Sequence, residues 1–155
     1  MKLRTVTKND FSLIKELDIE FYDHHKKFKT LLQDIDPRKY YLKKDFISIL
    51  DNKNKFFKIA VIDEVEAGYI YGVIKKLPPN EKNFKKMGII NSIVVSRKYR
   101  NKGIASYMLK ELIKWFKSKE VKYVEARCNV KNDKIIKLNR KLGLKEYHYV
   151  FGGRI

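Results

Sequence analysis

Residues 87–118 read MGIINSIVVSRKYRNKGIASYMLKELIKWFKS, and this stretch is the most informative part of the chain. Its first nine residues, Met87–Val95, are almost continuously apolar, which is typical of a strand buried on both faces. A basic turn with one glycine follows at Ser96–Gly103. From Ile104 onward, apolar residues recur at helical spacing with lysines between them, which predicts an amphipathic helix. This order of elements directs backbone N–H groups and the positive end of a helix dipole toward one point, which suits a phosphate.

The turn contains the sequence Arg100-Asn101-Lys102-Gly103-Ile104-Ala105. Gly103 allows the main chain to approach a ligand where a Cβ would obstruct it, and Arg100 and Lys102 add positive charge. No Gly-Lys-Ser/Thr follows, and one glycine stands where a dinucleotide fingerprint needs three. On the loop alone, phosphate binding competes with the plainer interpretation of a solvated basic loop.

Two segments of the chain resemble the GNAT (Gcn5-related) N-acetyltransferases. Val94-Val95, Arg100-x-x-Gly103-x-Ala105 and the long helix are similar to the acyl-CoA motif of that family, which is Arg or Gln, two residues, Gly, one residue, and Gly or Ala. Residues 132–144, NDKIIKLNRKLGL, are similar to its Asn-x-x-Ala-x-x-Leu-Tyr-x-Lys-x-Gly-Phe segment. The order of the other predicted elements also fits, so we expect one GNAT-like domain over residues 1–155.

The resemblance implies an acetyl-CoA-dependent N-acetyltransferase that modifies a primary amine of a small molecule, peptide or protein. It implies an α/β fold with a central mixed, mostly antiparallel sheet flanked by helices and with the cofactor at the splayed central strands. In the family, main-chain N–H groups of the central strand bind the pantetheine and thioester carbonyl, and the loop amides bind the pyrophosphate. The expected cofactor-binding residues are Ile93, Val94, Val95, Arg100, Asn101, Lys102, Gly103, Ile104, Ala105, Ser106 and Asn132.

The side-chain roles depart from the family pattern. The tyrosine that usually protonates the leaving thiolate aligns with Asn139, whose amide cannot act as an acid, although it can hydrogen-bond a sulfur or hold a water. Where a general-base carboxylate often lies on the central strand, this sequence has Asn91 and Ser92, which can only order a water. Tyr147, on the expected C-terminal strand, is a candidate replacement acid, with aromatic packing as the competing interpretation. The candidate catalytic residues are therefore Asn139, Tyr147 and Asn91.

Length and composition bound the remaining possibilities. At 155 residues with 44% hydrophobic residues, the chain fits one domain with a real core. The single Cys128 excludes an intramolecular disulfide and a cysteine-based metal cluster. His24 and His25 fit an exposed helix end better than a metal site, so we expect no metal. With no apolar run of signal-peptide or membrane-spanning length, we expect a cytoplasmic protein without a membrane partner.

The formal net charge of +18 is unevenly placed. Residues 1–77 hold 16 Lys and Arg against 12 Asp and Glu, whereas residues 78–155 hold 20 against 6. The excess can attract an anionic cofactor or a partner such as nucleic acid, or it can reflect a lysine-rich composition in general. We favour the last, because lysines alternate with isoleucine and asparagine throughout the chain.

The remaining elements are predicted from hydrophobic periodicity and from the residues typical of turns and helix caps. Gly68 and Gly72, within an expected strand, favour a bulge or a close backbone approach. A free sheet edge at the C-terminus makes a homodimer possible. The expected elements are a strand at Lys2–Thr7, a helix capped by Asn9 or Asp10 and ending near His25, a break at Pro37, a helix at Tyr41–Leu50, a hairpin of Phe56–Ile62 and Ala67–Ile74, a loop at Leu77–Lys86, a strand at Val121–Cys128, a helix at Asp133–Lys141 stopped by Gly143, and a strand or hairpin at Lys145–Ile155.

Three functions remain open. The preferred one is acetyl-CoA-dependent acetylation of an amine. The second is a protein of this fold that binds acyl-CoA with little or no transferase activity, which the substitutions at Asn139 and Asn91 permit. The third is a basic protein associated with nucleic acid, but Ser96–Lys122 lacks the interleaved aromatics of a single-strand binder and no helix-turn-helix is evident.

Overall fold

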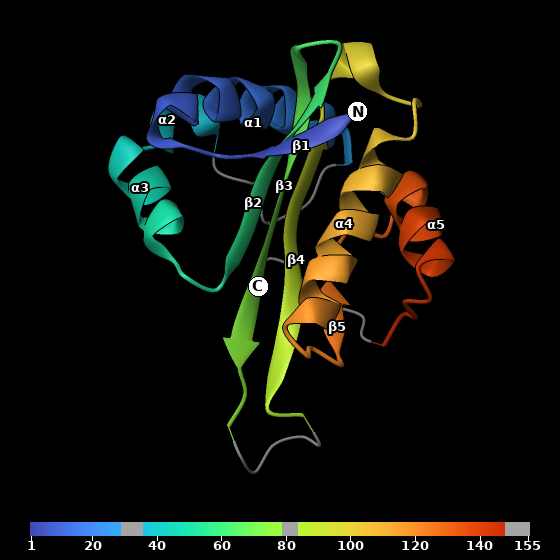
Figure 1. Cartoon of the computed structure of the whole chain (residues 1–155). Coiled ribbons are helices and arrows are strands. Elements are labelled where there is room, and N and C mark those ends of the chain that lie inside the picture. Colours follow the sequence, from blue (N-terminus) through green and yellow to red (C-terminus); the bar gives the residue numbers. More distant parts are fainter. Residues whose placement is uncertain (29–35, 79–83, 148–155) are drawn as a thin grey trace, which may run out of the picture.

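The computed structural model describes residues 1–28, 36–78 and 84–147, and it contains one five-stranded sheet with helices on both faces (Figure 1). The strands lie in chain order, with antiparallel pairing from β1 to β4 and parallel pairing between β4 and β5. The predicted mixed, mostly antiparallel α/β fold is therefore confirmed. The elements are β1 (Lys2–Thr5), α1 (Phe11–His25), α2 (Pro37–Tyr40), α3 (Lys43–Asp51), β2 (Lys55–Ile62), β3 (Val65–Lys76), β4 (Lys86–Val95), α4 (Ile104–Ser118), β5 (Val124–Ala126) and α5 (Asp133–Lys141).

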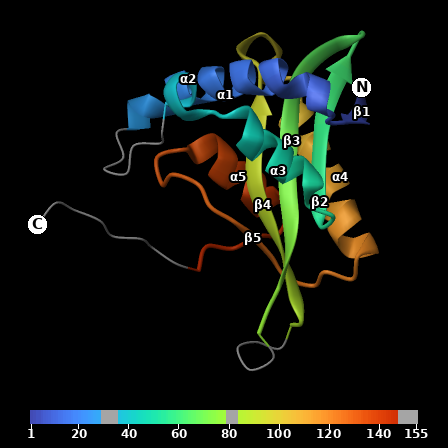
Figure 2. The ribbon, with the colours of Figure 1, turned by 90° about the vertical axis from the view of Figure 1, so that its left-hand side faces the viewer.

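Each face of the sheet carries its own hydrophobic core. Helices α1, α2 and α3 lie on one side, and α4 and α5 lie on the other, as the two views show (Figures 1 and 2). On the first face, Ile14 of α1 and Phe46 of α3 pack with Ile59 of β2. On the second face, Leu109 of α4 packs with Ile70 of β3. Central strands with apolar residues on both faces bury them in both cores, as the continuous apolar run predicts.

Close backbone approach explains the two glycines of β3. A Cβ on Gly68 would lie 2.2 Å from the carbonyl oxygen of Val94, and one on Gly72 would lie 2.8 Å from the side chain of Leu112. Neither position tolerates a side chain without movement of the neighbouring strand or of α4. The prediction of a bulge or a close approach at these glycines is confirmed.

Several element boundaries differ from the prediction. β5 has only three residues, Val124–Ala126, instead of the expected Val121–Cys128, because its pairing with β4 ends there. Pro37 does not break the chain but begins the short helix α2, where the missing N–H of proline costs no helical hydrogen bond. The expected second helix begins at Lys43 rather than Tyr41.

The expected C-terminal strand or hairpin is not seen where it can be examined. Residues 145–147 belong to no helix or strand, and residues 148–155 lie outside the described residues. The sheet edge proposed for a homodimer therefore also lies outside them. Among the described segments, no helix has the length and apolar character needed to cross a membrane.

A buried ion pair fixes the start of α1. Asp10 is 8% exposed, and its carboxylate accepts two hydrogen bonds from the Arg4 guanidinium, at 2.9 and 2.7 Å. It also accepts from the backbone N–H and the hydroxyl of Thr7, at 2.7 and 2.9 Å. The Asp10 side chain thus closes a capping box with Thr7 at the 3-10 turn and does not cap α1 itself. Because both oxygens of the Asp10 carboxylate are hydrogen-bonded, the pair stabilises the junction between β1 and α1.

Asp10→Ala should lower the free energy of unfolding by about 1–3 kcal/mol, because the Thr7 donors lose their acceptor and the half-buried Arg4 guanidinium keeps only its bond to Glu66. Urea denaturation at pH 7 measures the change. The hydrogen bond from Arg4 is the main cause that lowers the pKa of Asp10 below its ordinary 3.8. This stabilisation is therefore complete above pH 3.8 and is lost only as the pH falls through the lower pKa of the folded state.

Asp51→Ala, at an exposed carboxylate at the end of α3, is the matched control and should change stability by less than about 0.5 kcal/mol. Equal losses in the two variants would contradict the role given to the Asp10 network.

Candidate functional site

The site begins where β4 and β5 part. The two strands pair at Gly88 with Val124, Ile89 with Glu125 and Ile90 with Ala126, and the pairing does not continue. β4 itself runs on to Val95, which remains paired to Gly68 of β3. The peptide groups of β4 that point toward β5 beyond Ile90 therefore border an opening in the sheet.

A β-bulge lies at the start of this opening. In the pairing of β3 with β4, Tyr71 lies opposite Ser92 but Gly72 lies opposite Ile90, which makes Asn91 the extra residue. The bulge changes which face each residue occupies, since Ile90 and Ile93 both pack on the α4 side. Asn91 and Ser92 consequently line one cavity on the opposite side, although neighbouring residues of a regular strand face opposite sides.

The loop before α4 presents open backbone N–H groups. Gly103 is the N-cap of α4 in a left-handed conformation, with φ of 77°, and no side chain caps the first turn of the helix. Asn101 is left-handed as well, with φ of 63°. A Cβ built on Gly103 would meet no atom within 4 Å. An exposed turn at 101–103 before an uncapped 15-residue helix has the form of an anion-binding site, which fits a pyrophosphate.

The Arg100 side chain turns inward and holds the loop. Its Nε donates to the carbonyl oxygen of Val95 at 3.0 Å, and Nη2 lies 3.4 Å from the Glu20 carboxylate. Nη1 donates to Nδ1 of His24 at 3.1 Å, which requires a lone pair on that nitrogen. The guanidinium expected to add charge for a phosphate is thus engaged in positioning, whereas Lys102 remains exposed.

Glu20 of α1 anchors the same loop from the other side. Its carboxylate accepts from the Ser96 hydroxyl at 3.1 Å and from the backbone N–H of Arg97. Together with the ion pair to Arg100, these contacts join the loop after β4 to the middle of α1. The sequence gives no sign of this role of Glu20, because 76 or more positions separate it from these partners.

The end of α1 also contacts the second motif. The Asn132 side chain accepts from the N–H of Ile135 as N-cap of α5, and its Nδ2 lies 3.3 Å from Nε2 of His25. Nδ1 of His25 lies 3.1 Å from the carbonyl oxygen of Phe21, so a ring protonated at Nδ1 has Nε2 as the acceptor for Asn132. His24 and His25 end α1 as predicted, but the prediction that this end is exposed is wrong, since both are half-buried and contact motif residues.

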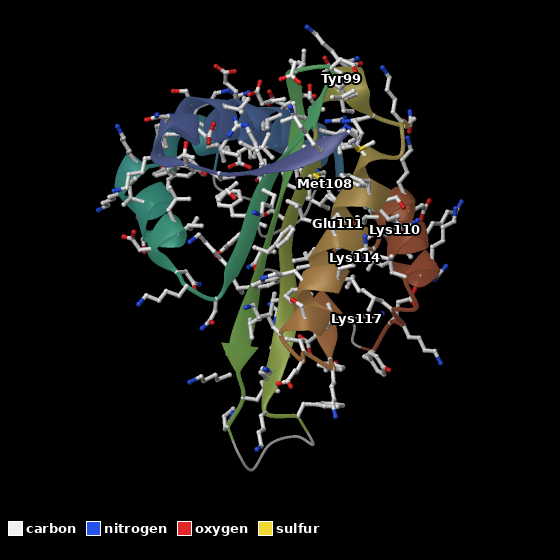
Figure 3. All side chains as sticks on the ribbon, in the orientation of Figure 1. Tyr99, Met108, Lys110, Glu111, Lys114 and Lys117 are labelled. Atoms are coloured by element: carbon white, nitrogen blue, oxygen red, sulfur yellow. The ribbon has the colours of Figure 1, made fainter. Side chains whose placement is uncertain are left out.

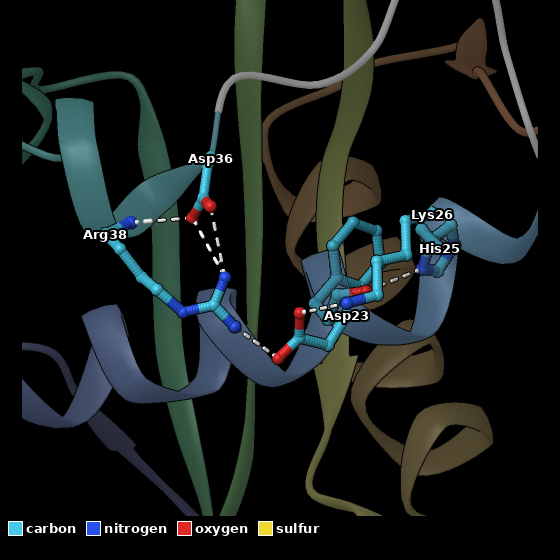
Figure 4. Close-up of polar contacts among 6 residues, drawn as sticks. Asp23, His25, Lys26, Asp36 and Arg38 are labelled. Carbon is cyan, nitrogen blue, oxygen red and sulfur yellow. Dashed lines mark hydrogen bonds and ion pairs between the residues drawn. The ribbon is translucent and has the colours of Figure 1, made fainter.

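Helix α2 is docked onto the same end of α1 (Figure 4). The Arg38 guanidinium bonds the carboxylates of both Asp36 and Asp23, and Asp23 also accepts from Lys26 at 3.0 Å.

Among the described residues, no group of three or more histidine, cysteine or acidic side chains is arranged to hold a metal ion.

A cavity of about 260 Å³ lies beside the bulge on the α1 face. Asp18 is its only charged lining residue in the described part of the chain, and the rest is aromatic, apolar or neutral polar. The half-buried Asp18 carboxylate accepts from the hydroxyls of Tyr69 and Tyr41, and the Ser92 hydroxyl bonds that of Tyr69. The residues that line the cavity are Ile14, Asp18, Tyr41, Ile49, Phe57, Tyr69, Tyr71, Asn91 and Ser92.

Burial and hydrogen bonding set the protonation of this cluster. Burial raises the pKa of Asp18 above its ordinary 3.8, although the bonds from Tyr69 and Tyr41 act in the opposite direction. Burial and the neighbouring Asp18 raise the pKa of both tyrosines, so the phenols stay neutral donors. Sequence reasoning missed Asp18, yet one signal was present: it lies four residues after the core residue Ile14 on the same helical face.

The sequence-predicted residues fall into two groups. The expected cofactor-binding residues border the opening or the start of α4: these are Ile93, Val94, Val95, Arg100 and residues 101–106. Asn132 caps α5 nearby, where Lys134 donates a hydrogen bond to Asn101 at 3.4 Å. The candidate catalytic residues are dispersed. Asn91 is exposed at the cavity, Asn139 is half-buried on α5, and Tyr147 is 69% exposed in the segment after α5.

The basic side chains of α4 lie away from its packed face. Figure 3 shows Lys110, Lys114 and Lys117 along the outer side of the helix and Met108 turned toward the sheet. Met108 is fully buried, and Lys114 is paired to Glu111 at 2.6 Å. This pattern confirms the predicted amphipathic helix.

Comparisons with known proteins agree with this geometry. A model of the acetyltransferase (GNAT) family matches residues 18–144. No curated protein matches the sequence. A mutant of the BH1408 protein from Bacillus halodurans is 17% identical with a TM-score of 0.87, covering 100% of this chain and 99% of its own. The aminoglycoside 6'-N-acetyltransferase AAC(6')-IG from Acinetobacter haemolyticus is 18% identical with a TM-score of 0.72, covering 100% and 99%. The aminoglycoside N-acetyltransferase AAC(6')-Iy, in complex with CoA, is 19% identical with a TM-score of 0.74, covering 99% and 93%.

Glu20→Ala should lower the free energy of unfolding by about 1–3 kcal/mol, because the Ser96 and Arg97 donors lose a partly buried acceptor. Urea denaturation measures the loss, and amide hydrogen exchange should become faster in residues 96–103.

Glu16→Ala on the exposed side of the same helix is the control and should change neither quantity. Unchanged exchange of the loop in the Glu20 variant would show that α1 does not hold it.

Proposed function

The chain belongs to the GNAT acetyltransferase family, and from this premise we propose that it is an acetyl-CoA-dependent N-acetyltransferase that modifies a primary amine of a small molecule or peptide. The observation that carries the proposal is the bulge at Asn91 at the point where β4 and β5 part. It combines an opening bordered by the peptide groups of β4 that have lost their strand partner β5 with a cavity on the opposite side of β4. One substrate can enter from each side and meet at the bulge.

The residues present fit the phosphates and the pantetheine arm of the cofactor. The N–H groups of the 101–106 turn and the first turn of α4 would hold the pyrophosphate, and Lys102 and Lys134 lie at the same place. The peptide groups of Ile93–Val95 would hold the pantetheine amides in the manner of an added strand. When bound, acetyl-CoA supplies the activated acetyl thioester. A structural neighbour solved with CoA supports this choice of cofactor.

Asn139 and Asn91 depart from the family pattern, and these departures favour a second candidate function. A chain without the usual tyrosine and the usual strand carboxylate is also suited to binding acyl-CoA with little turnover. Tyr147, proposed from the sequence as the replacement acid, is exposed in a segment without regular structure. Solvent protonation of the leaving thiolate removes the need for it, since a thiol with an ordinary pKa near 8.5 is a good leaving group at neutral pH.

Calorimetric titration with acetyl-CoA, followed by measurement of thiol release against a panel of primary amines and peptides, tests the proposal. We expect saturable one-site binding and amine-dependent release of CoA. Binding without release on the whole panel would support the second function. An absence of acetyl-CoA binding would overturn both.

Gly103→Val should weaken CoA binding at least about tenfold, because a branched side chain obstructs the approach of the phosphate to the backbone and the left-handed conformation becomes strained by about 1–2 kcal/mol. Calorimetric titration with CoA gives the affinity.

Gly143→Val is the matched control for strain. Gly143 has φ of 82° and, like Gly103, no atom within 4 Å of an added Cβ. This variant should lose similar stability and keep its CoA affinity. Equal CoA affinities in the two variants would contradict the phosphate loop.

Asn139→Ala should change kcat by less than about threefold, whereas loss of a true general acid costs about 10²–10⁴-fold. The variant Asn139→Tyr, which restores the family residue, should raise kcat or leave it unchanged. Steady-state thiol release measures both. A hundredfold loss in the alanine variant would assign Asn139 a direct role in the reaction.

A further inference from the structure

We propose that the cavity around Asp18 is the acceptor subsite, that it takes a primary monoamine with an aromatic or apolar flank, and that Asp18 is the counter-ion and the proton acceptor of that amine. This inference rests on the proposed function and assigns its acceptor. Three observations carry it: the position of the cavity, its single charge, and the hydrogen bonds that connect this charge to the bulge.

The position of the cavity places an acceptor at the reacting end of the site. Asn91 and Ser92 of the bulge form one wall, on the face of β4 opposite α4. A volume of about 260 Å³ is slightly below the range of about 300–1,000 Å³ that is usual for ligand pockets. The cavity suits one small group and is too small for a molecule made of several linked sugar rings.

The lining selects a cation with one charge. Asp18 is the only charged group among the described residues that line the cavity, and Tyr41, Tyr69 and Tyr71 are the other titratable groups there. A carboxylate has room for about four hydrogen bonds, and the two tyrosines occupy two, so acceptor capacity remains for an ammonium. Aromatic faces add cation–π attraction and contact area for an apolar flank. A polycation finds no second carboxylate among the described lining residues and must approach a protein of net charge +18.

Asp18 is also placed to take a proton. The Ser92 hydroxyl bonds Tyr69, and Tyr69 donates to Asp18, which makes a hydrogen-bonded path from the bulge to the carboxylate. Burial raises the pKa of Asp18, and the same low-dielectric site lowers that of an ammonium, so the cost of transfer between them falls.

The step balances as follows. The ammonium R–NH₃⁺ gives one proton to the Asp18 carboxylate, and the freed nitrogen lone pair forms the N–C bond to the acetyl carbonyl carbon. The C–S bond breaks and its electron pair leaves on sulfur. The second proton lost by the nitrogen ends on the thiol, and Asp18 returns its proton to solvent. The products are an N-acetyl amine, CoA–SH and one proton.

The test compares native protein with Asp18→Asn, using 2-phenylethylamine as the monoamine and spermine as the polycation. Calorimetry without acetyl-CoA should show 2-phenylethylamine binding that falls at least about tenfold in the variant, while acetyl-CoA affinity is unchanged. In native protein, kcat/KM should fall at acid pH as Asp18 is protonated, and this acid limb should be lost in the variant.

The variant should remain folded. Because burial raises the pKa of Asp18, its favourable contribution to stability is complete below pH 3.8 and is lost as the pH rises through the folded-state pKa. The uncharged amide should therefore not lower the free energy of unfolding at pH 7. Asp45→Asn, at an exposed carboxylate in the first turn of α3, is the control and should leave amine binding unchanged.

Each result separates the inference from the proposed function. Equal binding of 2-phenylethylamine by native protein and Asp18→Asn, tighter binding of spermine, or no binding of 2-phenylethylamine would overturn the inference. Thiol release with an amine whose kinetics do not depend on Asp18 would leave the proposed function standing without it. Amine binding that depends on Asp18, together with an absence of turnover, would establish the subsite and overturn the transferase.

Discussion

The end of pairing between β4 and β5 is the constraint on which the rest of the site depends. Parallel strands normally continue with evenly spaced hydrogen bonds, but here the ladder stops at Ile90 and Ala126. The extra residue Asn91 re-aims β4 at that point. Buried peptide groups must find a partner, so those of β4 beyond Ile90 that face the opening favour a ligand with peptide-like groups of its own. The same bulge turns Asn91 and Ser92 into the cavity, so one irregularity forms both halves of the site.

Helix α1 contacts both halves of the site, the opening with its loop and the cavity, and so fixes their relative position. Four of its residues reach different parts of the site: Asp18 the cavity, Glu20 and His24 the loop before α4, and His25 the cap of α5. The helix is fixed at its start by the Asp10 network and near its end by the ion pair of Asp23 with Arg38. A shift of α1 would move the loop and the cavity together. Cofactor and acceptor geometry are therefore coupled through an element far from both motifs in the sequence.

Local patterns predicted most of the fold but only part of the site. Residues 133–141 form the expected helix at the predicted bounds, because an N-cap asparagine, helical periodicity and a left-handed glycine all agree there. The length of β5 was wrong, because the alternation in Val121–Cys128 carries no information about where its partner bends away. The contacts of Glu20 with Ser96 and Arg100, and of Asp18 with Tyr69, join residues that are 51 to 80 positions apart. Such contacts are set by the assembled tertiary structure: the spacing of Asp18 from Ile14 indicates an inward helical face but does not identify the partner on it.

Charge acts at two ranges in this protein, and the short range decides selectivity. Most of the lysines and arginines are on the surface, where salt at physiological concentration screens them beyond about 8 Å. They can steer an anionic cofactor toward the loop, but they distinguish poorly between amines. The Asp18 carboxylate is half-buried among tyrosines, where screening is weak and each unpaired charge is costly. Among the described lining residues, this one carboxylate neutralises one ammonium and offers no partner to a second positive charge inside the cavity. The cavity thus discriminates by charge count as well as by size, which the net charge of the chain alone cannot do.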